Sequence, residues 1–101
     1  MQDLKITLIQ TNLVWENIEK NVQYFQTKIE ALNKETDLII LPEMFSTGFS
    51  MNAEQLAEPM DGPTIRWMRR ISEKYNFDIT GSLYYLLNSL AYLVVSCCVL
   101  T

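Results

Sequence analysis

DLIILPEMFSTGFSMN, residues 37–52, places an unbroken apolar run directly before a proline and a glutamate. The run Leu38 to Leu41 is typical of a strand that is covered on both faces in the middle of a sheet. Pro42 has no N–H for the next ladder hydrogen bond, so we expect the strand to end there and Glu43 to lie just past its carboxyl end. Open α/β sheets hold their binding and catalytic sites at that edge.

Glu43 is therefore the candidate catalytic residue of the chain. With Met44 and Phe45 beside it and a buried strand behind it, its carboxylate would be partly shielded from water and suited to accept a proton. The alternative is an exposed loop glutamate that follows a core strand. Spacing alone favours this alternative, because single carboxylates rarely carry a function by themselves.

The residues before this stretch predict a strand and a helix. Leu4, Ile6 and Leu8 alternate with polar residues, which indicates a strand with one face more deeply buried than the other. A helix is expected from about Asn17 to Lys34, where apolar residues recur at helical spacing. Its core-facing stripe comprises Ile18, Val22, Phe25, Ile29 and Leu32. Together with the run at 38–41, these elements make a βαβ unit with parallel strands.

The residues after Glu43 predict a loop and a short helical turn. Phe49 and Met51 in the loop could line a pocket beside Glu43, or both could pack on the sheet. The sequence favours neither alternative for Phe49 and Met51. A helical turn is expected from Ala53 to Ala57.

A second helix and a third strand complete the predicted core. Pro63 suits the first turn of the helix, Asn76 suits its end, and a strand is expected to begin at residues 77–80. Ile65, Met68, Ile71 and Tyr75 form the apolar face of this helix. Arg66, Arg69 and Arg70 could bind an acidic substrate, although a solvated helix face is the commoner explanation.

Composition limits the size and the chemistry of the chain. The 101 residues, 49% of them hydrophobic, suffice for one small domain with a modest core. A net charge of -4 leaves no basic surface for nucleic acid, which we exclude as a partner. The chain has no histidine, which excludes Ser-His-Asp triads, Cys-His dyads and His-based metal sites within it.

Neither the start of the chain nor its cysteines indicate export. Asp3 and Lys5 interrupt the apolar pattern of residues 1–12, which therefore does not match a signal peptide. Cys97 and Cys98 are adjacent, a poor arrangement for a structural disulfide. We expect a cytoplasmic location.

Three segments of the chain share their order and spacing with a known enzyme superfamily. They are LKITLIQTNLVW at residues 4–15, DLIILPEMFSTGFSMN at residues 37–52 and ITGS at residues 79–82. Together they resemble the amino-terminal part of the carbon-nitrogen hydrolase (nitrilase) superfamily, and the LPEMFSTGF form is most similar to its omega-amidase branch. The resemblance runs from about Leu4 to Leu83. It implies an α/β fold, the amino-terminal part of an αββα sandwich in the order β-α-β-loop-α-β. In this chain an uncharged apolar tail follows that part.

The resemblance also implies a Glu-Lys-Cys triad acting on a nonpeptide C–N bond. In that triad a cysteine thiolate attacks the amide carbonyl, the glutamate moves protons and the lysine stabilises the oxyanion. Glu43 matches the family's glutamate by its LPE setting, so the resemblance assigns that role to it. None of the lysines sits in the family's lysine motif. Cys97 and Cys98 lack the aromatic and acidic residues expected after the nucleophile, and we interpret them as buried small apolar residues.

The implied substrates are short linear molecules with a terminal amide, of the 2-oxoglutaramate or 2-oxosuccinamate type, hydrolysed to the acid and ammonia. The resemblance implies no cofactor and no metal, and it implies a homodimer. Because the chain as written lacks the lysine and the cysteine of the triad, we expect it to be inactive as an amidase.

The end of the chain differs in character from the rest. All 20 charged residues lie between Asp3 and Asp78, which leaves none in the last 23. One explanation is a membrane segment over residues 83–100, although no basic residue follows it to fix its orientation. A second is a hairpin, SLYYLL and LAYLVV turning at Asn88-Ser89, that continues the sheet. The third, which we favour, is that translation leaves the family's reading frame just after Leu83.

The predicted organisation is thus a partial carbon-nitrogen hydrolase domain at residues 1–83 and an apolar tail, in our favoured reading out of frame, at residues 84–101. Two other functions stay open. One is a non-catalytic fragment that pairs with a full-length relative through an exposed sheet edge. The other is a small tail-anchored membrane protein that uses residues 83–100 as its anchor.

Overall fold

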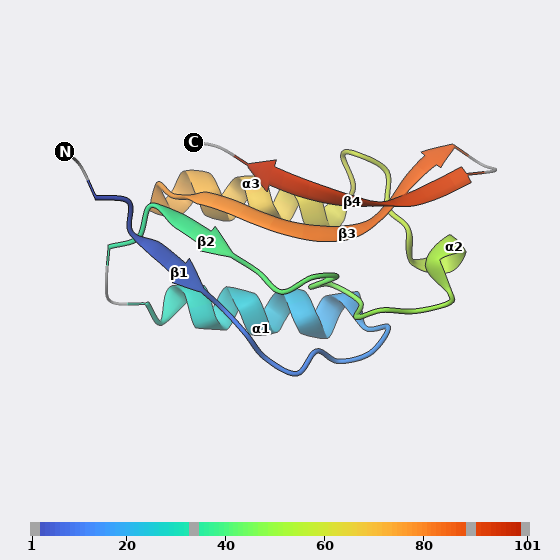
Figure 1. Cartoon of the computed structure of the whole chain (residues 1–101), viewed down its shortest axis with the longest axis horizontal. Helices are drawn as coiled ribbons and strands as arrows, with labels where there is room; N and C mark the ends of the chain where they lie inside the picture. Colours follow the sequence, from blue (N-terminus) through green and yellow to red (C-terminus); the bar gives the residue numbers. More distant parts are fainter. Residues whose placement is uncertain (1–2, 33–34, 89–90, 100–101) are drawn as a thin grey trace.

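A computed structural model describes residues 3–32, 35–88 and 91–99, with side chains up to residue 86. Four strands lie within these residues (Figure 1): β1 (Ile6–Leu8), β2 (Leu38–Ile40), β3 (Asp78–Asn88) and β4 (Ala91–Val99). Three helices accompany them: α1 (Ile18–Glu30), α2 (Ala53–Leu56) and α3 (Pro63–Tyr75). The predicted order of elements up to the third strand is confirmed.

The strands form one sheet in the order β1-β2-β3-β4. β1 pairs with β2 in parallel, with Ile6 opposite Leu38, and β2 pairs with β3 in parallel, with Leu38 opposite Asp78. The predicted parallel βαβ unit is therefore confirmed. Because the first three strands run in the same direction, the residues that follow each of them lie at the same edge of the sheet.

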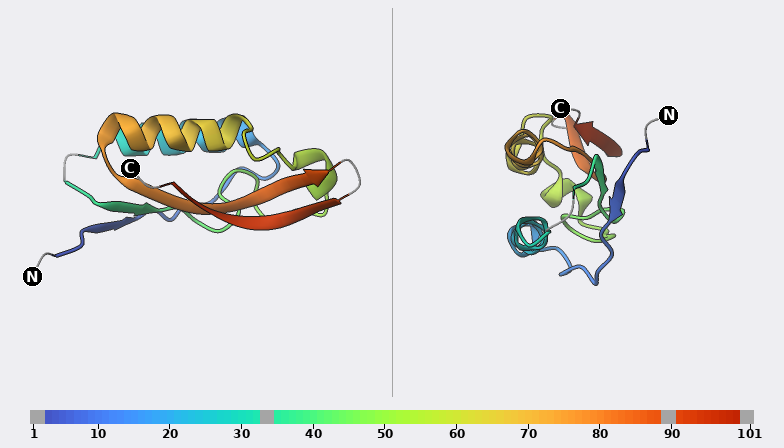
Figure 2. Two further views of the ribbon diagram at one scale, coloured as in Figure 1. Left: turned by 90° about the horizontal axis from the view of Figure 1, so that it is seen from above. Right: turned by 90° about the vertical axis from the view of Figure 1, so that its left-hand side faces the viewer.

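Both long helices pack on one face of this sheet. Figure 2 shows α1 and α3 side by side on that face, over the middle strands. The central side chains Ile39 in β2 and Ile79 in β3 are completely buried. The core that they share with the helices also includes Phe25, Ile29, Leu41, Phe45, Ile65, Trp67, Met68, Ile71, Phe77 and Leu83. The sheet and the two helices thus bury one continuous apolar core.

The first strand is shorter and more exposed than its sequence predicts. Leu4, Ile6 and Leu8 are 64%, 50% and 65% exposed, so the apolar side of the predicted alternation is the exposed side. Thr7, on the opposite side, is half-buried. The two long helices lie on one face of the sheet (Figure 2). Thr7 is opposite the buried Ile39 in the register, so Ile6 and Leu8 face the other side, which none of the described helices covers.

Helix α1 begins where predicted and ends earlier. The Asn17 side chain caps it by accepting a hydrogen bond from the Lys20 N–H at 3.0 Å. Its last helical residue is Glu30, and the N–H of Leu32 bonds to the oxygen of Ile29 at 3.1 Å, which tightens the final turn. The predicted extension to residue 34 is therefore wrong at Ala31 and Leu32, while residues 33–34 lie outside the described residues. Leu32, predicted to face the core, is 38% exposed.

Helix α3 has the predicted bounds. Pro63 is its first residue, and Asn76 ends it in the left-handed conformation with φ 58°. The arginines of the basic cluster are exposed, and Arg69 pairs with Asp61 at 2.8 Å. The solvated helix face is therefore the better interpretation of this cluster. The short turn predicted near residue 53 is also present, as α2.

The backbone of the last segment forms the hairpin that was the second explanation for the tail. β3 and β4 pair antiparallel, from Ile79 opposite Val99 to Asn88 opposite Ala91. The predicted turn at Asn88-Ser89 falls partly on residues 89–90, outside the described residues. No described helix is long and apolar enough to cross a membrane. Whether the tail follows the family's reading frame stays a prediction.

Gly81 in β3 lets the ring of Phe45 lie against the backbone of the sheet. A Cβ atom at position 81 would lie 2.6 Å from Cδ1 and 2.8 Å from Cε1 of Phe45. The Phe45 ring is fully buried and meets Phe25 of α1 edge to face, with ring centroids 5.9 Å apart. It also lies 6.3 Å from the ring of Trp67 in α3. One aromatic side chain thus joins the sheet to both helices.

The substitution Gly81→Ala should therefore destabilise the fold. The added methyl group overlaps the Phe45 ring, and we expect the free energy of unfolding to fall by about 1–3 kcal/mol, measured by urea denaturation. The double variant Gly81→Ala, Phe45→Leu should lose less than the sum of the two single losses, because the smaller side chain makes room for the methyl group. Equal stability of Gly81→Ala and the parent chain would contradict this account.

The helix cap provides a second test of the fold. Asn17→Ala removes the side-chain acceptor for the Lys20 N–H and should lower the free energy of unfolding by about 1 kcal/mol. Asn17→Asp keeps an acceptor at the same place and should stay close to the parent. Thermal unfolding followed by circular dichroism separates the two variants. If the alanine and aspartate variants are equally stable, the cap contributes nothing.

Candidate functional site

Glu43 lies where the sequence places it, just past the carboxyl end of β2. The N–H of Leu41 still bonds to the oxygen of Thr80 at 2.9 Å, and Pro42 then ends the pairing with β3. The Glu43 side chain is exposed. No residue in 3–32 or 35–86 makes a hydrogen bond or ion pair with its carboxylate. Among the residues with described side chains, the carboxylate is therefore uncovered.

The shielding expected from Met44 and Phe45 is not found. Both side chains are completely buried, yet they leave Glu43 uncovered. Phe45 points to the helix face of the sheet, where it meets Gly81, and Met44 packs with Ala53 and Tyr84 in a second, smaller cluster. Because both neighbours turn into the protein, the glutamate is presented outward.

A tight turn at Met44 produces this arrangement. Met44 has a φ of 50°, in the left-handed region, which costs a residue with a side chain about 1–3 kcal/mol. The Met44 carbonyl accepts hydrogen bonds from the N–H groups of Thr47 at 3.2 Å and of Gly48 at 2.8 Å. Gly48 also has a positive φ, 73°, which glycine adopts without strain. The turn is thus closed by its own backbone on one side.

Strand β3 holds the other side of the turn through Ser82. The Met44 N–H donates to the Ser82 hydroxyl oxygen at 2.9 Å, and the Phe45 N–H donates to the Ser82 carbonyl at 3.3 Å. Gly81 and Ser82 are neighbours in a strand, so they face opposite sides of the sheet. The two residues therefore hold the turn from both faces of β3, Gly81 by giving space to a ring and Ser82 by accepting hydrogen bonds.

Asn21 connects the same loop to the start of α1. It is buried, and its amide nitrogen donates to the carbonyl of Val14 at 2.7 Å and to that of Ser46 at 2.8 Å. Its amide oxygen accepts from the N–H of Val14 at 2.8 Å. A buried amide with three such bonds fixes two chain segments relative to each other. Residues 14 and 46 are thereby held together although 32 positions separate them.

Glu16 forms a further link between the segment before α1 and the loop. Its carboxylate accepts hydrogen bonds from the Ser50 hydroxyl and the Asn52 side-chain amide. Its N–H donates to the carbonyl of Thr47 at 2.8 Å. The Tyr84 hydroxyl bonds to both the N–H and the carbonyl of Ser50, at 2.9 and 2.8 Å. These bonds order the loop as far as residue 52.

The two apolar residues of this loop face solvent. Phe49 and Met51 are 69% and 97% exposed, so the alternative in which both pack on the sheet is wrong. The indole N–H of Trp15 donates to the carbonyl of Phe49 at 3.0 Å, and Trp15 is itself 64% exposed. Phe49 and Met51 on the loop that follows Glu43, and Trp15 bonded to this loop, are therefore exposed apolar residues. Their role in lining a pocket stays a prediction.

No lysine of the described residues lies beside Glu43. Lys5 lies at the amino end of β1, the opposite end of the sheet, and pairs with Glu35 at 3.2 Å. Lys20, Lys28 and Lys74 are exposed on α1 and α3. Lys34 lies outside the described residues. The described residues hold no group of three His, Cys, Asp or Glu side chains that could bind a metal ion.

Both cysteines lie on the backbone of β4. Cys97 is opposite Gly81 and Cys98 is opposite Thr80 in the antiparallel pairing. Their side chains are outside the described part, so the interpretation of both as buried apolar residues stays a prediction.

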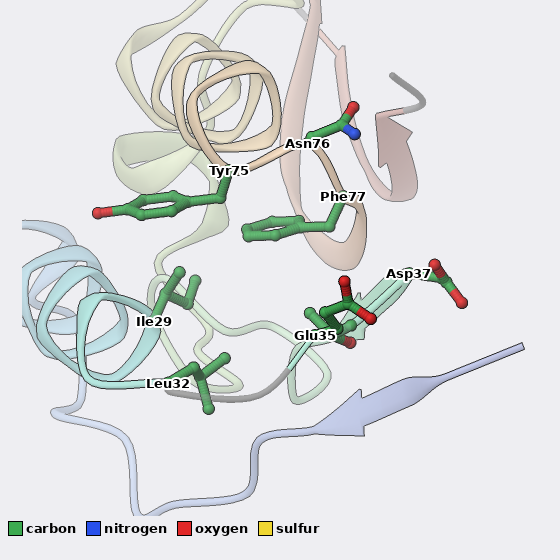
Figure 3. Close-up of a pocket in the computed structure, with 8 residues that line it drawn as sticks. Ile29, Leu32, Glu35, Asp37, Tyr75, Asn76 and Phe77 are labelled. Carbon is green, nitrogen blue, oxygen red and sulfur yellow. The ribbon is translucent and has the colours of Figure 1, made fainter.

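A separate pocket lies at the amino ends of β2 and β3, away from Glu43 (Figure 3). It has a volume of about 590 Å³, and the stacked rings of Tyr75 and Phe77, 6.1 Å apart, form one wall. Ile29, Leu32, Glu35, Thr36, Asp37 and Asn76 complete the lining. Its residues come from the carboxyl ends of α1 and α3 and from the segments that lead into β2 and β3, so it lies at the end of the sheet opposite to the candidate site.

Sequence reasoning predicted the position of Glu43 after β2 but missed Asn21, Ser82 and Glu16. For Asn21 a signal was present, because it lies three residues after Ile18 and four before Phe25, on the apolar stripe of the helix. A polar residue on such a stripe must find buried partners. Ser82 belongs to the ITGS motif, but its bond to Met44 depends on strand pairing between residues 38 positions apart.

Known proteins share this arrangement of sequence and fold. The family model for carbon-nitrogen hydrolase matches residues 5–93. The chain is 42% identical over 82 residues to the omega-amidase YafV of Yersinia enterocolitica and 38% identical to that of Escherichia coli K12. The match covers 81% of this chain and 31% of each relative, so the chain spans about a third of their length.

Solved structures agree with this result. The crystal structure of XC1258 from Xanthomonas campestris, a CN-hydrolase superfamily protein, superposes with a TM-score of 0.80 at 34% identity. That match covers 93% of this chain and 40% of the other. The structure of an N-terminal amidase bound to a Gln-Val peptide shares the fold, with a TM-score of 0.82 at 20% identity, over 95% of this chain and 25% of the other. On this evidence the chain belongs to the carbon-nitrogen hydrolase family.

Proposed function

We propose that this chain supplies the proton-moving glutamate of an amidase that hydrolyses the terminal amide of short linear substrates. The substrates would be of the 2-oxoglutaramate or 2-oxosuccinamate type, and the products would be the acid and ammonia. The observation that carries the proposal is the presentation of Glu43, exposed at the carboxyl edge of parallel strands on a turn held by β3. The similarity to omega-amidases supports the substrate class.

The proposed mechanism assigns Glu43 one task. Its carboxylate would take a proton from the attacking cysteine and return one to the leaving ammonia, which lowers the barrier of both steps. The nucleophile and the oxyanion-stabilising lysine would have to come from outside the residues described, because no described lysine lies beside Glu43. We therefore propose that the 101-residue chain by itself has no amidase activity. The complete enzyme would be a cytoplasmic homodimer.

The test uses a chimera in which residues 1–83 of this chain replace the matching segment of the Yersinia enterocolitica omega-amidase. This chimera should release ammonia from 2-oxoglutaramate, whereas the 101-residue chain alone should release none. The substitution Glu43→Gln in the chimera should lower kcat by about 100-fold or more, the usual contribution of general acid–base catalysis.

The matched control is Glu73→Gln, which neutralises another exposed glutamate on the outer surface of α3. It should leave kcat within about twofold of the chimera, since exposed charges far from a reaction contribute little. Full activity of the Glu43→Gln chimera would overturn the assignment of Glu43.

A second candidate function is pairing with a full-length relative, without catalysis. The exposed edge strand β1 favours it, because Leu4, Ile6 and Leu8 present an uncovered apolar face. The partner would be a complete carbon-nitrogen hydrolase that lays its own apolar surface on this face.

Co-purification of the tagged chain with such a relative, after expression in the same cell, tests this pairing. Ile6→Lys should abolish the association, because a charge at the centre of the apolar face would be buried in the complex. Val14→Lys changes an exposed apolar residue outside β1 and should leave it intact. Absence of co-purification by the parent chain would exclude this function.

A further inference from the structure

We propose that Ser82 is a positioning residue for Glu43. Its hydroxyl oxygen fixes the peptide between Glu43 and Met44, and thereby the direction in which the glutamate leaves the sheet. The proposal rests on the proposed function of Glu43 as the group that moves protons.

The geometry ties Ser82 directly to the peptide that follows Glu43. The N–H that Ser82 accepts, at 2.9 Å, belongs to Met44, and this nitrogen is bonded to the carbonyl carbon of Glu43. Because a peptide unit is planar, a hydrogen bond to its nitrogen orients the carbonyl and the Cα of the preceding residue as well. The next N–H, of Phe45, bonds to the Ser82 carbonyl at 3.3 Å. One residue of β3 thus receives two successive N–H groups of the turn.

Both the oxygen and the hydrogen of the Ser82 hydroxyl contact Met44. Its oxygen accepts from the Met44 N–H, and its own hydrogen points to the Met44 sulfur, with Oγ and Sδ 3.8 Å apart. A thioether is a weak acceptor, so this second contact chiefly sets the orientation of the hydroxyl. The lone pairs of the oxygen are then directed at the peptide N–H.

The turn needs such a contact because its backbone is strained. Met44 has a φ of 50°, a conformation that residues other than glycine rarely adopt unless other contacts stabilise it. Burial of its side chain against Ala53 and Tyr84 supports the conformation from one side, and the Ser82 hydroxyl supports it from the backbone. Without the hydroxyl the peptide could rotate toward an unstrained conformation, and the Glu43 carboxylate would move with it. Misplacement of a catalytic group by about 1 Å costs on the order of 100-fold in rate.

The test combines a direct readout in the 101-residue chain with kinetics in the chimera. In the chain, Ser82→Ala should speed the hydrogen exchange of the Met44 amide, measured by NMR, by at least about 10-fold, because the amide loses its acceptor. In the chimera, the same substitution should lower kcat by about 10- to 100-fold, with KM changed less than about threefold, as expected when orientation rather than binding is lost.

Two conservative variants keep the test decisive if the alanine variant folds poorly. Ser82→Thr keeps the hydroxyl on a half-buried side chain and should restore kcat to within about threefold of the chimera. Ser82→Cys keeps the volume but offers a weaker acceptor, so it should reproduce most of the loss. The control Ser72→Ala removes another buried hydroxyl, which donates to the Phe77 carbonyl far from the turn, and should leave kcat unchanged.

Each outcome decides the proposal. Faster exchange together with a kcat loss that threonine rescues supports it. Unchanged exchange, or faster exchange with unchanged kcat, overturns it. An active Glu43→Gln chimera overturns the proposed function instead. In that case the exchange of the Met44 amide would still show whether Ser82 holds the turn.

Discussion

The packing of the Phe45 ring against Gly81 is the contact on which the rest of the structure depends. The ring lies between the sheet and both long helices and contacts Phe25 and Trp67 there. Burial of such a side chain contributes about 1.5–3 kcal/mol, and its aromatic contacts add to this. The same contact also fixes the chain immediately after Glu43. The stability of the core and the geometry of the candidate site therefore share one residue.

At the candidate site, three consecutive residues lie in three different surroundings. Met44 enters the small cluster with Tyr84, Phe45 enters the main core, and Glu43 stays in solvent. The left-handed backbone of Met44 makes this arrangement possible. In a continued strand Glu43 and Phe45, two positions apart, would have faced the same side of the sheet. Asn21 and Glu16 then secure the loop from the other side. The exposed glutamate is thus carried on a turn that hydrogen bonds and packing hold in place.

The features that the sequence predicted correctly are those governed by local chemistry. The strand before Glu43 follows from an apolar run ended by Pro42, and the bounds of α3 follow from Pro63 and Asn76. The features that it missed depend on distant residues. The exposure of Leu4, Ile6 and Leu8 is decided by where both helices pack, and the role of Ser82 is decided by a partner 38 positions away. Apolar alternation predicts that a face can be buried, but it does not say what covers it.

The two tryptophans lie in contrasting surroundings, which gives the protein two internal optical reporters. The indole N–H of Trp15, which is largely exposed, donates to the loop after Glu43, whereas Trp67 is buried and its indole N–H donates to the Gln26 side chain of α1. Emission from an indole shifts to shorter wavelength when water is excluded, so Trp67 emits at shorter wavelength than Trp15. Quenchers dissolved in water reach the first and not the second. Loosening of the loop is therefore spectroscopically distinct from melting of the core.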